Sequence, residues 1–372
     1  MCRMTFPNRI QVTETMKTLH DLKHKTVAPL LAAAGLSLIS GASYAADYPE
    51  RIASEERSRR VGVGLDEVSL LSRVQGPGAE KIASELLSRF HSLPSAVHTS
   101  DRYRKEANEK QISLVSDEGW HLQVFADGSS VRYRNYRYLS ETGAKLARPV
   151  AERFSQEQLE KMGRNFIEEN LRDLVALGED EQLVSFFSRF EVTGGGSTKP
   201  GARMDPEMVQ ASTVVFTRTV GGLPVVGGGS KIAVLFANDG QPVGFDFDWP
   251  RYEKTGQAQK VLSLDEIKKR GQEYSPLKAD DPAVKEVHFD CGYVDFGARK
   301  RDVKAPVQAG CLRQAAKKSI IDREAYARDK NSGHVLSASL DYFPAGATVE
   351  PDAVWESARK PEGTEPPSAG TR

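Results

Sequence analysis

The sequence predicts an α+β fold, in which helices pack on antiparallel β-sheets in repeated helix-then-hairpin units. Segments with apolar residues at helical spacing alternate with β-like runs in which apolar residues recur at every second position. Two of the helical segments open with a capping box, and Asp-Gly or Asn-Asp-Gly turns separate pairs of β-like runs. A helix followed by antiparallel strands appears three times, so helices laid on antiparallel sheets are the expected architecture.

The first 45 residues have the pattern of a secretory presequence. From Met16, the expected start, a lysine-containing stretch leads into an apolar run over residues 27–39, and the small residues Ser43 and Ala45 follow it. We therefore expect cleavage after Ala45 and a mature protein that is periplasmic or extracellular. No later segment approaches the roughly 20 apolar residues that span a bilayer, so no integral membrane segment is expected after cleavage.

The sequence has no net charge that would attract a partner to the chain as a whole. Lys and Arg together number 51, and Asp and Glu together also number 51. No net charge therefore draws the chain to nucleic acid or to an anionic membrane. We expect no nucleic-acid partner, and any charge-driven partner must use a local patch.

The N-terminal unit, residues 78–150, is expected to combine a helix with a hairpin. Apolar residues at helical spacing predict a helix over 78–90. Two β-like runs at 120–125 and 129–139 flank Asp127-Gly128, which is a strong hairpin signal. The unit is preceded by residues 46–77, a charged segment that we expect to be a loose linker.

The next unit, residues 151–260, opens with a helix and continues with strands. Ser155 and Gln158 form the capping box of the helix. Four β-like runs follow, at 183–192, 212–220, 231–237 and 241–249. The last unit, residues 261–354, repeats the pattern with a capping box at Ser263, and residues 355–372 have the composition of a disordered tail.

Two cysteines remain in the mature chain, Cys291 and Cys311, twenty positions apart. An exported protein folds in an oxidising compartment, which favours a disulfide between them. The alternative, a metal site, would need further ligands, and His288 is the only histidine close by. We expect no metal and no cofactor.

The stretch between Val220 and Phe236 is rich in glycine, and either a phosphate-binding loop or a set of turns would need glycines there. Gly222 and Gly227 have the spacing of a phosphate-binding loop, but Gly228 stands where the lysine should be. The residues that follow form a β-like run, whereas such a loop leads into a helix. The glycines are therefore interpreted as hairpin turns and bulges that need positive φ.

The same region resembles a known family. The resemblance covers about residues 154–249 and rests on Phe216, Gly222-Leu223-Pro224-Val225-Val226-Gly227-Gly228, the alternating Ile232, Val234 and Phe236, Asn238-Asp239-Gly240 and Val243. In these features, and in the helix that precedes them, the chain looks like the PepSY and fungalysin/thermolysin-propeptide group. The resemblance implies an exported, non-enzymatic module that binds or inhibits a protein partner, often a peptidase. No H-E-x-x-H sequence follows, so such a partner would be a separate chain.

Two groups of residues are candidates for binding a protein or peptide partner in the cell envelope or the medium. The first lies in the glycine-rich hairpin, which we expect to leave an open strand edge that accepts an extended peptide. The second is an arginine and tyrosine pattern that is able to grip an anionic glycan or an acidic protein, or that is only the outer face of an amphipathic strand. The candidates are Gly222, Pro224, Gly227 and Gly228 in the first group and Arg132, Arg134 and Tyr136 in the second.

Enzymatic chemistry has one weak candidate. Asp246 and Asp248 point to the same side of a strand and would suit two catalytic carboxylates or a calcium ion, although a solvated strand face explains them as well. No G-x-S-x-G sequence is present, and the histidines are scattered. A binding or inhibitory module is therefore the favoured function. An envelope structural or assembly protein and a hydrolase that uses the two aspartates remain alternatives.

Overall fold

The computed structural model of the protein describes residues 66–90, 102–195, 205–275, 284–300, 303–320, 323–328, 334–352 and 355. All of the described residues belong to one compact unit. The predicted presequence, its cleavage site and residues 356–372 of the predicted tail lie outside the described residues.

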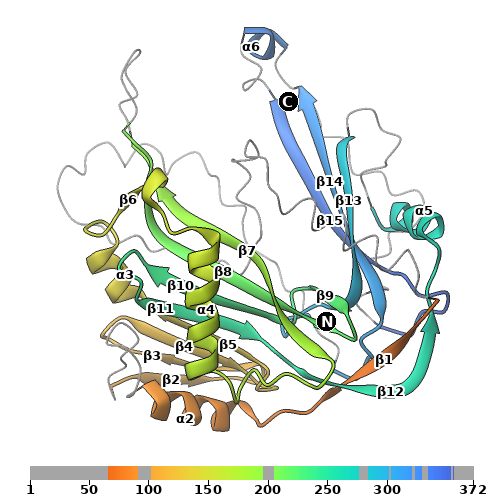
Figure 1. Cartoon of the computed structure of the whole chain (residues 1–372), viewed down its shortest axis with the longest axis horizontal. Coiled ribbons are helices and arrows are strands. Elements are labelled where there is room, and N and C mark those ends of the chain that lie inside the picture. Colours follow the sequence, from red (N-terminus) through yellow and green to blue (C-terminus); the bar gives the residue numbers. More distant parts are fainter. Residues whose placement is uncertain are drawn as a thin grey trace, which may run out of the picture. The chain divides into compact units, whose positions relative to one another are not determined.

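Strands dominate the described chain and form two sheets (Figure 1). The small sheet pairs β1 (Glu67–Val74) with β12 (Arg251–Lys260). The large sheet has 13 strands, and β6 (Arg148–Pro149) and β7 (Glu181–Thr193) pair with its strand β8. The spatial order of its other strands is β15 (His334–Pro344), β14 (Ala309–Ile320), β13 (Val284–Asp295), β9 (Leu223–Gly227), β8 (Met208–Val220), β10 (Lys231–Ala237), β11 (Pro242–Asp248), β5 (Ser130–Asn135), β4 (Trp120–Phe125), β3 (Gln111–Val115) and β2 (Arg104–Ala107).

The predicted fold class is wrong. The chain is mostly β, with large multi-stranded sheets and few helices, and it is not a series of helix-then-hairpin units. The strands of the three predicted units are joined into one sheet, because β5 pairs with β11 and β9 pairs in parallel with β13. These pairs join segments about a hundred or about seventy residues apart in sequence. Local periodicity, which predicts an element but not its partner, carries no signal for them.

The individual helices and turns agree better with those predicted from the sequence. The described helices are α2 (Ala79–Phe90), α3 (Tyr136–Thr142), α4 (Gln156–Asn170), α5 (Leu264–Tyr274), α6 (Arg323–Arg328) and the short 3-10 helix η3 (Val150–Glu152). Both predicted capping boxes are present, at Ser155 with Gln158 and at Ser263 with Glu266. The Asp127-Gly128 hairpin between β4 and β5 is also confirmed.

Two segments differ from the expectation. The predicted strand over 129–139 ends at Asn135, because the Asn135 side chain accepts a hydrogen bond from the Tyr138 backbone N–H at 3.0 Å and caps helix α3. The segment expected to be a loose linker contains β1, whose Val68 and Leu71 are buried. These two side chains belong to a hydrophobic cluster, and the strand that carries them pairs with β12.

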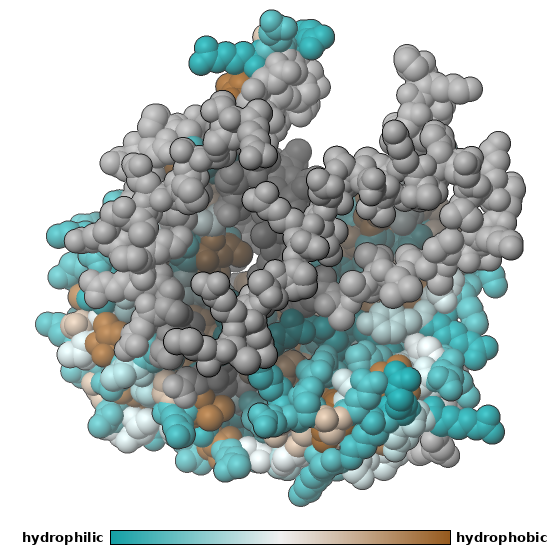
Figure 2. Space-filling model, turned by 180° about the vertical axis from the view of Figure 1, so that it is seen from behind, coloured by the Kyte–Doolittle hydropathy of each residue, from teal (hydrophilic) through white to brown (hydrophobic). Residues whose placement is uncertain are grey.

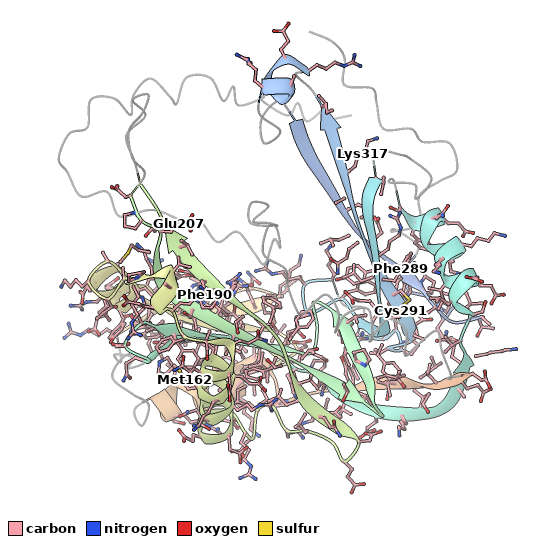
Figure 3. The ribbon with its side chains drawn as sticks, turned by 45° about the horizontal axis from the view of Figure 1, so that its top comes forward. Met162, Phe190, Glu207, Phe289, Cys291 and Lys317 are labelled. Atoms are coloured by element: carbon pink, nitrogen blue, oxygen red, sulfur yellow. A yellow bond between two sulfur atoms is a disulfide. The ribbon has the colours of Figure 1, made fainter. Side chains whose placement is uncertain are left out.

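The main hydrophobic core lies between one face of the large sheet and the helices α2 and α4. Ile82 and Leu86 of α2 and Leu159 and Phe166 of α4 are buried against strand residues such as Phe245. Met162 of α4 and Phe190 of β7 pack against the same core (Figure 3). From behind, the coloured residues in the lower half of Figure 2 are mostly hydrophilic, and the hydrophobic ones stand in small groups.

A second core lies beneath α5, where β13 and β14 are joined by the disulfide. Ile267 of α5 is buried with Phe343 of β15 and with the cysteine pair. Cys291 and Cys311 face each other directly across β13 and β14, with their Cα atoms 4.0 Å apart, and they form the predicted disulfide (Figure 3). Among the described helices, none has the length and the apolar composition that crossing a membrane requires.

The disulfide gives the first test. Replacing Cys291 and Cys311 together with alanine should lower the free energy of unfolding by about 3 kcal/mol, because the bridge closes a loop of 20 residues in the unfolded chain. Urea denaturation of the oxidised protein and of the double variant measures the difference. Two titratable thiols in the unfolded, non-reduced mature protein would show that the bridge does not form.

Candidate functional site

The glycine-rich loop, residues 227–230, joins β9 to β10 and packs against the end of β13. A Cβ atom on Gly227 would lie 2.2 Å from the backbone oxygen of Asp295, and one on Gly229 would lie 2.4 Å from its Oδ1. Gly227 also has φ of 106°, which favours glycine. The prediction that these glycines serve the backbone is confirmed here, and close approach to β13 is the reason for two of them.

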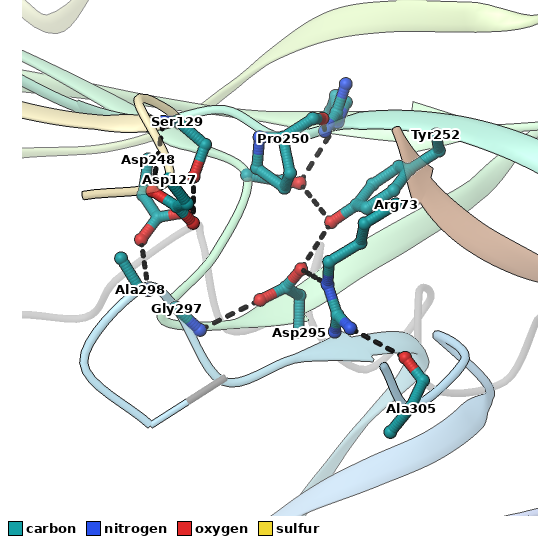
Figure 4. Close-up of polar contacts among 12 residues, drawn as sticks. Arg73, Asp127, Ser129, Asp248, Pro250, Tyr252, Asp295, Gly297, Ala298 and Ala305 are labelled. Carbon is teal, nitrogen blue, oxygen red and sulfur yellow. Dashed lines mark hydrogen bonds and ion pairs between the residues drawn. The ribbon is translucent and has the colours of Figure 1, made fainter. Parts of the chain in front are cut away.

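Asp295 is the anchor of this loop, and its side chain is fully buried. Its Oδ2 atom accepts hydrogen bonds from Arg73 Nε at 3.0 Å and from the Tyr252 hydroxyl at 2.8 Å, and its Oδ1 accepts from Gly297 N at 2.9 Å (Figure 4). The backbone N–H of Gly229 donates to the Asp295 carbonyl at 2.9 Å. The space beside the loop is therefore filled by a carboxylate, so the loop is not shaped for a phosphate group.

A buried arginine continues this network to the start of β7. Arg218 of β8 donates from Nε to Ser230 Oγ at 3.0 Å and from Nη1 to Glu181 Oε2 at 2.9 Å. Its guanidinium lies 4.4 Å from the ring centroid of Trp249 and 4.1 Å from that of Tyr252. Because Glu181 is the first residue of β7, the network fixes this strand relative to the loop.

The edge of β9 is not open, which corrects the expectation for the glycine-rich hairpin. β9 pairs with β8 on one side, and β13 pairs with it in parallel from Val225 to Gly227 on the other. Pro224 is buried in this strand. Gly222, with φ of 81°, lies in the exposed turn before it, and Gly228 is exposed in the turn after it. Only these two of the four predicted hairpin residues lie on the surface.

Among the described strands of this part of the sheet, β7 has an edge that pairs with no second strand. Within the described part of the chain β7 pairs only with β8, and the ladder is interrupted by irregularities between Ser185 and Phe187 and between Glu191 and Val192. Residues 183–188, Leu-Val-Ser-Phe-Phe-Ser, carry no charge and are half-buried. The Leu183 carbonyl accepts long hydrogen bonds from Arg164 of α4, at 3.3 and 3.4 Å.

The edge strand β2 shows by contrast how an edge is protected from association. Its four residues, Arg104 to Ala107, are all exposed, and three of them are charged. Short length and charge prevent another strand from pairing at an edge. β7 has neither feature over residues 183–188.

The predicted arginines meet one of the predicted aspartates on the sheet. Arg134 of β5 donates from Nη1 and Nη2 to the two carboxylate oxygens of Asp246, each at 2.7 Å. Arg132 Nε lies 3.5 Å from Asp246 Oδ1. Gly244 leaves room for the Arg134 side chain, because a Cβ there would lie 2.7 Å from Arg134 Cδ. Tyr136 is separate from this group, since it begins helix α3, where it is 51% exposed.

Asp246 and Asp248 have different partners among the described residues. Both oxygens of Asp246 accept from Arg134, whereas Asp248 Oδ2 accepts from the backbone N–H of Ala298 at 2.6 Å. The described residues contain no group of three or more His, Cys, Asp or Glu side chains placed to hold a metal ion.

Lys231 is a residue that the sequence interpretation missed. It lies opposite Asp248 in the β10–β11 ladder, its Nζ donates to the Gly227 carbonyl, and Nζ lies 4.8 Å from the Phe186 ring centroid. Burial lowers its pKa to about 8, although Asp290, Asp248 and Asp295 oppose that shift. The position after the glycines was visible in the sequence, but its contact with Phe186 of β7 joins segments far apart in the chain.

Comparisons with known proteins do not assign the chain to a family. No family model matches it, and no curated protein does. Among solved structures it is similar to an uncharacterized protein from Eubacterium rectale ATCC 33656, with 11% sequence identity over 78% of this chain and 88% of that chain and a TM-score of 0.45. Likeness at this level supports no inference about fold or function.

The buried charge pair predicts a large effect at Asp295. Asp295→Asn removes the negative charge that faces Arg73, whose side chain is 6% exposed, and should lower the free energy of unfolding by about 3 kcal/mol. Asp180→Asn is the control, since Asp180 and Lys254 form an exposed pair that is expected to contribute less than about 1 kcal/mol. Equal losses in urea denaturation would contradict the anchoring role of Asp295.

Lys231 predicts a pH dependence. Its pKa of about 8 in the folded protein is below its ordinary value of 10.5, so the unfolded chain binds more protons between these pH values. The stability of the wild type should therefore rise relative to Lys231→Met as the pH increases from about 8 to 10.5. Urea midpoints of both proteins across this range measure the effect, and parallel curves would show that Lys231 is not buried as a charge.

Proposed function

We propose that this protein is an exported, non-enzymatic binding module of PepSY type, and that it takes up an extended segment of a partner protein as an added strand along β7. The observation that carries the proposal is the edge of β7, which is long, uncharged over residues 183–188 and without a second strand in the described chain. An exposed strand edge offers a row of backbone donors and acceptors to an extended peptide. Main-chain hydrogen bonds provide affinity, and side chains alternating on the two faces provide selectivity.

β7 is held in place before any partner arrives. Its ladder with β8 runs from Glu181, opposite Val220, to Thr193, opposite Met208, and Glu181 is also paired with buried Arg218. A binding edge that is already ordered avoids the entropy loss of ordering on association. This rigidity supports a docking role for β7.

The family resemblance supports the class of the proposed function. Over residues 154–249, helix α4 precedes the strands β7, β8, β10 and β11, which pair in antiparallel fashion. The resemblance suggests a module that binds or inhibits a separate protein, for which a peptidase is one candidate. The Cys291–Cys311 disulfide supports an oxidising compartment, and we propose the periplasm or the medium.

A hydrolase that uses Asp246 and Asp248 is not favoured. Both oxygens of Asp246 accept from Arg134, which leaves them poorly placed to activate water. A stable envelope assembly would differ from a reversible binding module only in the lifetime of the complex, and the experiment below measures that lifetime.

The proposal is tested in two steps. The mature protein is used to capture and identify partners from the exported proteins of its source, and binding of the purified partner is then measured. Hydrogen exchange should show new protection of the amides in residues 183–188, because an added strand hydrogen-bonds to that edge. The dissociation rate distinguishes a reversible module from a permanent assembly.

Variants locate the surface. Val184→Lys places a charge on the half-buried part of β7 and should weaken binding at least about tenfold. Val192→Lys, at an exposed position of the same strand, tests the edge with less risk to folding. Ala107→Lys on the charged edge β2 is the control and should leave binding unchanged. Full binding by both β7 variants, without protection of β7, would overturn the proposal.

A further inference from the structure

A polar cluster lies on the face of the large sheet opposite α2 and α4. It comprises His121 and Gln123 of β4, Arg132 and Arg134 of β5, and Asp246 of β11. His121 lies opposite Arg134, and Gln123 and Asp246 lie on either side of Arg132 in the ladders. These side chains therefore occupy two neighbouring rows on one face of the sheet. We call them the outer-face polar cluster.

Charge in the outer-face polar cluster is not balanced. Arg134 makes a bidentate pair with both oxygens of Asp246, which is the strong geometry for this pair. Arg132 has only a 3.5 Å approach of its Nε to the same carboxylate, and its side chain is 21% exposed. Gln123 is neutral and donates to Gln111 at 2.6 Å. Two guanidinium groups thus share one carboxylate, and one positive charge is left over.

Hydrogen-bonding capacity is also left over. Arg132 approaches Asp246 through its Nε at 3.5 Å, and its guanidinium makes no side-chain hydrogen bond to another residue that the structure describes. His121 Nε2 is buried and has no hydrogen-bond partner in the same part of the chain. Burial and the neighbouring Arg132 lower the pKa of His121, in spite of the opposing effect of Glu106, so the imidazole is neutral at pH 7. Buried polar groups without partners are rare in native structures and need an explanation.

We propose that the outer-face polar cluster binds a singly charged oxyanion, a carboxylate or a sulfate ester, held by the guanidinium fork of Arg132 next to the buried imidazole of His121. One negative charge balances the surplus, and the oxygens accept from the partly exposed guanidinium of Arg132. The Arg134–Asp246 pair supports this site, because it holds β5 and β11 in register and keeps Asp246 from turning fully to Arg132. This site is separate from β7 and does not depend on the proposed function.

The titration of His121 tests the proposal directly. Nuclear magnetic resonance of the folded mature protein reports the His121 pKa while acetate or methyl sulfate is added, with chloride at equal ionic strength as the reference. Both oxyanions should raise the pKa of His121, because a bound anion favours the imidazolium. Acetate and methyl sulfate distinguish the two ligand sources. A response to phosphate alone would contradict the single-charge argument, and no response to any oxyanion would overturn the site.

Variants of the arginines separate binding from general screening. Arg132→Gln should abolish the response of His121 to acetate and methyl sulfate, although its starting pKa rises because the neighbouring cation is gone. Arg132→Lys keeps the charge but loses the planar fork, and it should bind more weakly. Arg104→Gln removes an exposed arginine paired with Glu106 and should respond as the wild type does. An unchanged response in Arg132→Gln would show that no site exists at Arg132.

Discussion

The buried carboxylate of Asp295 is the constraint on which the rest of the structure depends. It receives Arg73 from β1, Tyr252 from β12 and the backbone of Gly297, so that one side chain joins segments more than two hundred residues apart. A buried charge is tolerated only when such partners replace the lost water. The anchor thereby ties the small sheet to the end of β13, and it gives the glycine-rich loop a fixed surface against which to pack.

The position of β7 follows from this anchor through a second buried ion pair. Tyr252 contacts both Asp295 and Ser230, and Ser230 accepts from Arg218, which holds Glu181 at the start of β7. Ser230 has φ of 54°, a conformation that a serine adopts only when its surroundings compensate. The hydrogen bonds of its hydroxyl to Arg218 and Tyr252 supply that compensation. The loop is therefore linked to the start of the edge strand β7 through Ser230 and Arg218.

The sequence predicted local structure well and long-range pairing poorly. Ser155 and Ser263 revealed their helices because a cap acts within four residues, and Asp127-Gly128 revealed a hairpin for the same reason. The pairings of β5 with β11 and of β9 with β13 join the predicted units into one sheet, and no local pattern encodes them. The open edge was accordingly assigned to the glycine-rich hairpin, whose strands β9 and β10 are each paired on both sides. The contact of Arg132 and Arg134 with Asp246 was missed for this reason too, although each residue had been singled out.

The glycine-rich loop is therefore distinct from the proposed binding surface on β7. Substitutions in the loop are nevertheless expected to disturb that surface. A Cβ on Gly228 would lie 2.8 Å from the Phe296 carbonyl, so even this exposed position is packed against the backbone after β13. A larger side chain there must displace the segment that contains Asp295, and the displacement would pass through Ser230 and Arg218 to Glu181. A Gly228 variant would thus lose partner binding whether the partner contacts the loop or β7. Such a variant does not distinguish the two surfaces. Only substitutions on the side of β7 that pairs with no other described strand, which leave the Asp295 anchor intact, separate the residue that shapes the surface from the strand that forms it.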